Sequence, residues 1–304
     1  MGRQVIVIAG PTCSGKTSIG IKLAKVLKGE VISADSRQIY KYLNIGTAKP
    51  TKEEMNGVKH HLIDFLEPDD DYNVSLFEED SLSIINDLLN KNIQPIIVGG
   101  SGLYIKAVTE GIFEGAETDE QLRLSLKRRM EDLGAQALLN ELKIVDPESA
   151  AKMLPTNHKR IIRALEVFYL TGKTISSLQK EYKRESDYTF IKFMLNYERE
   201  SLYKRIEKRV DKMIEFGLVE EVKKIVSLEF DRNLNALNTV GYKEIFDYLD
   251  NFINLETAVE LIKRNTRRYA KRQFTWFNGQ KDFVKIDIDD NTNLDEVINM
   301  IVKK

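Results

Sequence analysis

The eight residues Gly10-Pro11-Thr12-Cys13-Ser14-Gly15-Lys16-Thr17 decide the fold, because they fit the pattern Gly, four residues, Gly-Lys-Ser/Thr. The β-branched run Val5-Ile6-Val7-Ile8 before them predicts a strand, and apolar residues at helical spacing predict a helix from Lys16 to Leu27. A glycine-rich turn between a strand and a helix points main-chain amides and the helix N-terminus at one anion. The stretch therefore predicts a phosphate-binding loop, in which Lys16 adds a charge and the Thr17 hydroxyl ligates a magnesium ion held by the phosphates.

The phosphate-binding loop alone leaves its ligand open. A nucleoside triphosphate there would make the chain a kinase or an ATPase, whereas a substrate that loses diphosphate would make it a transferase. The residues at the neighbouring strand ends are needed to distinguish between these two kinds of ligand.

Strands and helices alternate through the first third of the chain. Val31-Ile32-Ser33-Ala34 and Pro95-Ile96-Ile97-Val98 predict two further strands, with a helical pattern from Leu76 to Leu89 between them. Such alternation indicates an α/β fold, here a P-loop NTPase-like parallel sheet flanked by helices. Ligands of these sheets bind outside the carboxyl ends of the strands. Because Asp35 to Gln38 and Ser101 follow two such ends, we expect them to converge on the phosphate-binding loop.

A purely helical segment interrupts this pattern. Strand signals vanish between residues 118 and 188, where Leu122, Leu126 and Met130 recur at helical spacing. Strand-like stretches at 190–195 and 283–286 and a helical pattern at 294–302 then return to the first domain. We expect a catalytic core of residues 1–117 and 189–304 with an inserted all-helical subdomain at 118–188.

The composition indicates an ordinary globular protein of 304 residues, with 42% hydrophobic and 31% charged residues. Its net charge of −1 argues against a nucleic-acid binder that is basic throughout, although six cations without an acid lie between Lys263 and Arg272. Cys13 is the only cysteine, which excludes an intramolecular disulfide, and with only three histidines beside it a Cys/His zinc site lacks ligands. We expect a cytoplasmic location, because the sequence lacks a secretory leader and a membrane-spanning run.

Asp35 ends an apolar strand and has three interpretations. It could be a magnesium ligand of the kind found in nucleotide hydrolases, or a general base above the phosphates. The third is a structural Asp that caps the following segment. The residues after it favour a catalytic role.

These neighbouring residues resemble the successive signatures of the tRNA dimethylallyltransferase family. The likeness begins at Asp35-Ser36-Arg37-Gln38-Ile39-Tyr40, Gly46-Thr47-Ala48-Lys49-Pro50 and Gly99-Gly100-Ser101-Gly102-Leu103-Tyr104. It continues through the segments 160–166, 205–210, 241–244 and 266–276, and so covers essentially the whole chain apart from its last residues. The main departure is Ser101, where the family usually carries threonine.

The resemblance implies transfer of a dimethylallyl group from its diphosphate to the exocyclic N6 amine of an adenosine in tRNA. The target is the adenosine 3′ to the anticodon, in tRNAs that read codons beginning with U. Asp35 is then the catalytic base, and Ser101 orients the amine or the bridging oxygen. The diphosphate is held by residues 10–17 (Gly10, Pro11, Thr12, Cys13, Ser14, Gly15, Lys16 and Thr17), by Mg²⁺ bound to Thr17 and, by resemblance, by Arg209.

Two regions are predicted to bind the tRNA anticodon stem-loop. An adenine must leave its stack to react, so the protein must grip the backbone and replace the stacking. The basic cluster offers cations and an aromatic ring for this purpose, namely Arg267, Lys271, Arg272 and Trp276. By resemblance, the helical insert contributes Arg123, Arg160 and Arg163, beside Lys159, and the core contributes Asp35, Ser36, Arg37, Gln38 and Ser101.

The sequence leaves two other functions open as alternatives. One is a P-loop kinase of a small metabolite, in which the helical insert serves as a lid. The other is a tRNA-binding module without enzymatic activity. The family resemblance suggests a monomer, and no protein partner is implied.

Overall fold

The computed structural model describes residues 3–111, 119–181 and 186–304. The chain divides into two compact units, Met1–Thr109 together with Ser186–Lys304, and Glu110–Glu185. The sequence placed the boundaries at 117/118 and 188/189, and the first of these lies at the edge of residues 112–118, outside the described residues.

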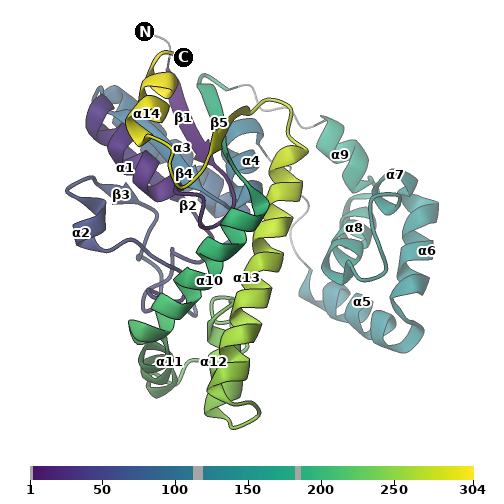
Figure 1. Cartoon of the computed structure of the whole chain (residues 1–304). Helices are drawn as coiled ribbons and strands as arrows, with labels where there is room; N and C mark the ends of the chain where they lie inside the picture. The colour runs from purple at the N-terminus through teal and green to yellow at the C-terminus, as the bar shows by residue number, and fades with distance from the viewer. Residues whose placement is uncertain (1–2, 112–118, 182–185) are drawn as a thin grey trace. The chain divides into compact units, whose positions relative to one another are not determined.

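The first unit is built on a parallel sheet whose strand order, within the described residues, is β3-β2-β4-β1-β5-β6 (Figure 1). Every neighbouring pair is parallel. The strands are β1 (Gln4–Ala9), β2 (Gly29–Ala34), β3 (His60–His61), β4 (Gln94–Gly99), β5 (Thr189–Tyr197) and β6 (Val284–Ile288). The predicted α/β fold class is confirmed, and the carboxyl ends of β1, β2 and β4 meet at one edge.

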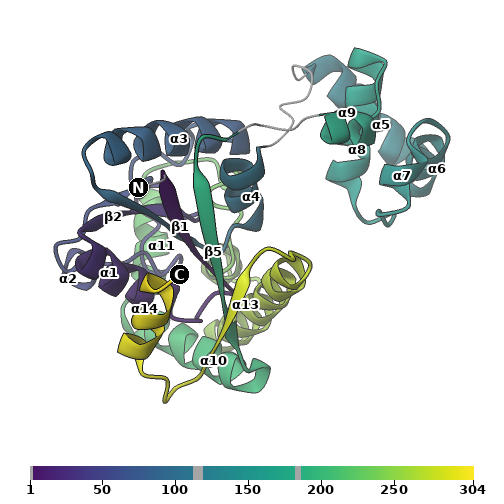
Figure 2. The same cartoon turned by 90° about the horizontal axis from the view of Figure 1, so that it is seen from above.

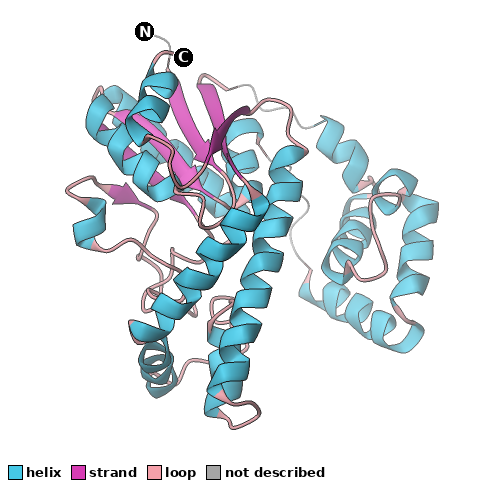
Figure 3. Cartoon of the chain, in the orientation of Figure 1, coloured by secondary structure: helices cyan, strands magenta, loops and turns pink. Residues whose placement is uncertain are grey.

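Helices cover both faces of this sheet (Figures 2 and 3). The alternation of side chains along β1 explains the two layers, since Ile6 and Ile8 pack with α1 and α14, and Val5 and Val7 pack with α3 and α4. The elements of this unit before the insert are α1 (Lys16–Leu27), α2 (Lys52–Met55), α3 (Val74–Asn90) and α4 (Gly102–Glu110). Those after it are α10 (Arg199–Glu215), α11 (Leu218–Ser227), α12 (Tyr242–Leu249), α13 (Leu255–Asn278) and α14 (Leu294–Val302).

A second core joins helices α10 to α13 to the segment after β2. Ile39, Tyr40 and Leu43 are buried against Tyr242 and Ile262. This packing fixes the loop that follows Asp35 on helices distant in sequence.

The second unit is helical, as predicted, in its described residues. Its helices are α5 (Glu120–Leu133), α6 (Ala135–Val145), α7 (Pro147–Ala150), α8 (His158–Thr171) and α9 (Ile175–Glu181). Leu126, Leu138, Leu142, Ile161 and Leu165 form its core, which is separate from those of the first unit. Across the described residues, no helix is both long and apolar enough to cross a membrane.

Candidate active site

The phosphate-binding loop lies between β1 and α1. Gly10 has φ +152°, and a Cβ there would lie 2.9 Å from the carbonyl oxygen of Leu195 in β5, so only glycine fits. Cys13 also has positive φ and is buried, consistent with a packing role. The Ser14 hydroxyl is buried and has no hydrogen-bond partner among the described residues, as expected of a group that donates to a ligand phosphate.

Lys16 begins α1 and points back into the loop, where its Nζ donates a hydrogen bond of 2.5 Å to the carbonyl oxygen of Pro11. Burial, and to a lesser extent the positive charge of Arg209, lowers the pKa of Lys16 to about 8, while Asp35 and Cys13 act in the opposite direction. Two cations whose charges repel at one loop are typical of an anion site.

Helix α10 brings two arginines to this loop. Arg209 Nη1 lies 3.4 Å from the Thr12 hydroxyl, to which it donates, and Arg205 Nε donates to the carbonyl oxygen of Cys13 at 3.1 Å. Arg205 is also paired with Asp290. Arg209 therefore lies at the phosphate-binding loop, and Arg205 supports the loop backbone.

Asp35 follows β2 and begins a turn. Its Oδ1 accepts hydrogen bonds from the main-chain N–H groups of Arg37 (2.9 Å) and Gln38 (3.4 Å). Within the described part of the chain, no group donates to Oδ2. The carboxylate thus has the capping role considered as an alternative, and a second oxygen remains for a further role.

Ser101 follows β4 directly beside this turn. Its Oγ accepts a hydrogen bond of 3.1 Å from the main-chain N–H of Ser36, and its own N–H donates to the carbonyl oxygen of Ala34. This close approach of β2 and β4 requires Gly99, because a Cβ there would lie 2.1 Å from the Ala34 oxygen. The strand ends of β2 and β4 therefore converge, as expected.

Tyr269 of α13 reaches the same place. Burial raises its pKa, and the negative charge of Asp35 raises it further, while Arg37, Arg272 and a hydrogen bond to Ser101 act in the opposite direction. Tyr269 is thus a third side chain at the Asp35–Ser101 pair. Tyr269 lies within the family-like segment 266–276, but the sequence does not place it beside Asp35.

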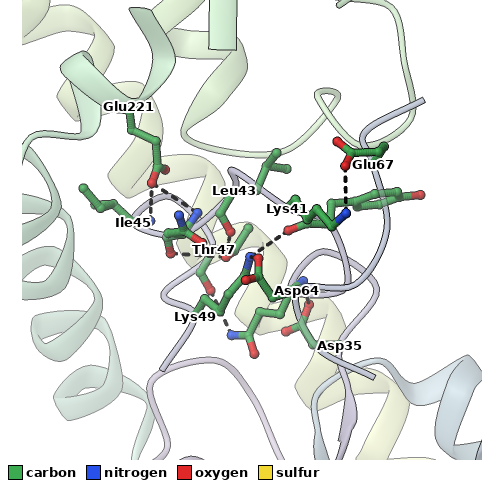
Figure 4. A network of polar contacts seen from close by, with 12 residues as sticks. Asp35, Lys41, Leu43, Ile45, Thr47, Lys49, Asp64, Glu67 and Glu221 are labelled. Carbon is green, nitrogen blue, oxygen red and sulfur yellow. Dashed lines mark hydrogen bonds and ion pairs between the residues drawn. The ribbon is translucent and has the colours of Figure 1, made fainter. Parts of the chain in front are cut away.

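A network of polar contacts holds the loop that follows Asp35 (Figure 4). Glu221 of α11 accepts hydrogen bonds from the N–H groups of Asn44, Ile45 and Gly46 and from the Tyr242 hydroxyl. The Gln38 amide in turn donates to the carbonyl oxygens of Thr47 and Ala48, both at 3.1 Å.

Two further contacts complete the network. Lys49, whose side chain is 5% exposed, donates to the main-chain carbonyl oxygen of Tyr40 and pairs with Asp64 at 2.6 Å. Arg37 donates to the main-chain oxygen of Asn235. These contacts hold the turn at Asp35 and the loop after it, and the sequence did not indicate three of the residues that make them, Asp64, Glu221 and Asn235.

Helix α13 carries the basic cluster, and the structure separates its cations. Lys263 pairs with Asp211 at 2.8 Å, and Arg267 pairs with Glu207 at 2.6 Å, both on α10. The other four cations are exposed: Arg264, Arg268, Lys271 and Arg272.

Trp276, predicted to bind tRNA, is partly buried with its indole against Gly102. A Cβ at Gly102 would lie 2.3 Å from the ring. The indole therefore packs against the segment that follows Ser101.

In the second unit, Arg123 and Arg163 share one carboxylate. Glu166 is fully buried, and its Oε2 accepts from Arg123 at 3.0 Å and from Arg163 at 2.8 Å. Lys159 and Arg160 are exposed at the start of α8. Two of the predicted tRNA contacts are therefore oriented by a buried acid.

No group of three or more His, Cys, Asp or Glu side chains suited to a metal occurs in the described ranges. The exposed Thr17 at the start of α1 fits a metal that is held mainly by phosphate oxygens and water. His61 has a partner of its own, because its Nε2 lies 2.5 Å from a carboxylate oxygen of Glu30.

Comparisons with known proteins agree with this geometry. The IPP transferase family model matches residues 38–280, and the isopentenyl transferase model matches residues 3–68. A tRNA dimethylallyltransferase of Thermotoga maritima is 47% identical over 92% of this chain and 91% of its own, and one of Pelotomaculum thermopropionicum is 44% identical over 98% and 95%.

Solved structures give the same result. The tRNA isopentenylpyrophosphate transferase of Bacillus halodurans is 40% identical, with a TM-score of 0.74 over 99% of this chain and 96% of that one. A eukaryotic dimethylallyltransferase acting on tRNA is 30% identical, with a TM-score of 0.78 over 94% and 74%.

Proposed function

The chain belongs to the IPP transferase family of tRNA dimethylallyltransferases, and from this premise we propose how its residues carry out the reaction. The enzyme transfers a dimethylallyl group from dimethylallyl diphosphate to the exocyclic N6 amine of an adenosine in tRNA, giving N6-isopentenyladenosine and diphosphate. The comparisons favour this activity over a small-metabolite kinase. We assign the target to the adenosine 3′ to the anticodon in tRNAs that read codons beginning with U, and the enzyme to the cytoplasm.

One observation supports the site assignment above all. The phosphate-binding loop after β1, the Asp35 turn after β2 and Ser101 after β4 lie at one sheet edge, with Ser36 bonded to Ser101. A nucleophile and a diphosphate ester must meet in one place for transfer to occur, and such positioning supplies much of the rate enhancement.

Asp35 acts as the general base in this proposal. The adenine amine is a weak nucleophile, because its lone pair is delocalised into the ring, so removal of a proton as it attacks is favourable. A positioned base contributes about 10²–10⁴-fold. The turn that engages Oδ1 of Asp35 holds the carboxylate, and Oδ2 takes the proton. Ser101 orients the amine or the bridging oxygen.

The diphosphate leaving group is stabilised by the loop. Its charge increases as the C–O bond breaks, so the main-chain N–H groups that the loop directs at the phosphates, Lys16 and Arg209 stabilise the transition state more than the substrate. Thr17, together with the phosphates, would hold Mg²⁺, which would supply further positive charge beside the leaving group. The loop therefore acts as a clamp for the leaving group.

The tRNA anticodon stem-loop is bound by both units. The exposed Lys271 and Arg272 of α13 and Lys159 and Arg160 of α8 bind the backbone, together with the arginines that flank Glu166. Ser36, Arg37 and Gln38 contact the anticodon loop beside the reactive adenine. Arg267 and Trp276 contact the tRNA and also stabilise the site, because Arg267 pairs with Glu207 and Trp276 packs against Gly102.

The activity is tested by supplying labelled dimethylallyl diphosphate, Mg²⁺ and unmodified tRNA, and separately ATP, with nucleosides identified by mass spectrometry after digestion. We expect N6-isopentenyladenosine in the first reaction and no comparable ATP turnover in the second. ATP consumption without labelled tRNA would instead support the kinase.

A further inference from the structure

Gln273 lies on α13 between the phosphate-binding loop and the end of β4. The side chain is buried, with 7% of its surface exposed. Its Oε1 accepts a hydrogen bond of 2.8 Å from the main-chain N–H of Thr12, and its Nε2 donates one of 2.9 Å to the carbonyl oxygen of Gly100. A single side-chain amide therefore connects the main chain at Thr12 with the main chain at Gly100, 88 residues later in the sequence.

The two segments are those that carry the reaction. Thr12 belongs to the diphosphate clamp and is also contacted by Arg209 through its hydroxyl. Gly100 immediately precedes Ser101, whose hydroxyl bonds to the Asp35 turn. The Gln273 amide thus connects the leaving-group side of the site with the nucleophile side.

The fit around Gln273 is close and specific for an amide. A Cβ at Gly100 would lie 2.3 Å from Nε2, so the approach needs glycine at that position. One partner is a donor and the other an acceptor, and only a side chain with both functions at this length satisfies the two buried groups. A methionine has the length without either function, and a glutamate has two acceptors.

We propose that Gln273 is a positioning residue that fixes the distance between the diphosphate clamp and the Asp35–Ser101 pair. The proposal rests on the proposed transferase function. Reacting atoms must approach to about 3–3.5 Å with correct alignment, and a misplacement of about 1 Å can cost 10²-fold in rate. Loss of the bridge lets the two loops move apart, which slows bond formation without removing any group that contacts the substrates.

The experiment compares Gln273→Met with Gln280→Met in single-turnover prenylation at saturating dimethylallyl diphosphate and tRNA. Gln280 is a matched control, because within the described residues its Nε2 donates only to a neighbouring group, the carbonyl oxygen of Trp276, at 3.3 Å. We expect Gln273→Met to lower the saturated rate by about 10–100-fold, with the Kd for tRNA within about twofold of wild type. Gln280→Met should retain the wild-type rate.

A purely structural role gives a different result. It predicts a lower melting temperature but an unchanged saturated rate below that temperature, and a folded Gln273→Met with that behaviour would overturn the proposal. If Gln273→Met does not fold, Gln273→Glu provides the same test at a pH where its carboxyl is ionised, because the carboxylate keeps the acceptor for Thr12 and cannot donate to Gly100. A folded Gln273→Glu with the wild-type rate would also overturn it.

The wild-type protein separates this proposal from the proposed function. Failure of wild type to prenylate tRNA removes the proposed function, whereas an active wild type with equally fast Gln273 variants removes only the role of Gln273.

Discussion

The main-chain N–H of Ser36 donates a hydrogen bond of 3.1 Å to the Ser101 hydroxyl. Because the Ser101 oxygen is the acceptor in this bond, its hydroxyl hydrogen can still be donated to another group. It also joins the two strand ends at which we place the base and the nucleophile. Ser101 stands where the family usually carries threonine, so the hydroxyl is retained without the methyl group.

Ser101→Ala should lower the saturated prenylation rate by about 2–13-fold, because one hydrogen bond contributes roughly 0.5–1.5 kcal/mol. Ser101→Thr should keep the wild-type rate, because it preserves the hydroxyl. Single-turnover assays on both variants test this. A threonine variant as slow as the alanine variant would show that the hydroxyl is not the group that matters.

Diphosphate binding should weaken as the pH rises above about 8. The pKa of Lys16 is lowered to about 8 by burial, and a bound anion raises it, so binding above that pH requires proton uptake. The Kd should increase by up to about tenfold per pH unit from this group. Calorimetric titration with inorganic diphosphate and Mg²⁺ between pH 7 and 9.5 measures the slope.

Two variants isolate the Lys16 contribution from the titration of diphosphate itself. Lys16→Arg should flatten the pH dependence, because arginine stays protonated in this range. Lys22→Arg, on the same helix but half exposed and paired with Asp295, should keep the wild-type slope. Equal slopes for wild type and Lys16→Arg would argue against Lys16 as the titrating group.

The salt dependence of tRNA binding should depend on the exposed cations of α13. Lys271→Gln and Arg272→Gln should each reduce the slope of log affinity against log salt by about 0.7–0.9. Lys263→Gln should change the slope less, because Lys263 is already neutralised by Asp211. Filter binding at several salt concentrations measures the slopes. A larger effect of Lys263→Gln than of Lys271→Gln or Arg272→Gln would contradict our division of the cluster into paired and exposed cations.

Much of the fold could be predicted from local pattern. The helices Lys16–Leu27 and Leu294–Val302 have the predicted bounds, because periodic apolar residues and clear ends define them. The two-residue strand β3 (His60–His61) escaped prediction, because it is too short to show a period. The same applies to α2, which has four residues.

The residues of the site could be predicted only where a sequence motif marks them. Asp35, Ser101 and the phosphate-binding loop stand at strand ends, so their convergence followed from the parallel sheet. Glu221 and Gln273 act through main-chain partners far away in the sequence, and no local pattern reports such contacts. For the same reason the sequence could not separate the paired Lys263 and Arg267 from the exposed cations.

Glu166→Gln should destabilise the helical unit. The fully buried carboxylate pairs with Arg123 and Arg163, and its loss leaves two partly buried guanidinium groups without their shared charge. Because both arginines are partly exposed, we expect a cost of about 1.5–3 kcal/mol of unfolding free energy, less than for a fully buried pair. Urea denaturation and tRNA affinity should both report the loss.

The control for Glu166 is Glu148→Gln in the same unit. Glu148 pairs with Lys152 and Lys180, all of them exposed, so its loss should change stability much less. Similar losses in the two variants would mean that burial of Glu166 is not the source of the effect.

The most direct measurement for this account is single-turnover prenylation of unmodified tRNA by Asp35→Asn, with Asp69→Asn as control. Asparagine can still accept the N–H bonds of Arg37 and Gln38, so the turn should persist while the base is lost. Asp69 is an exposed acid in the loop after β3. We predict that Asp35→Asn lowers the saturated rate by about 10²–10⁴-fold, with an unchanged affinity for diphosphate, and that Asp69→Asn keeps the wild-type rate. A wild-type rate in Asp35→Asn would contradict the proposed site.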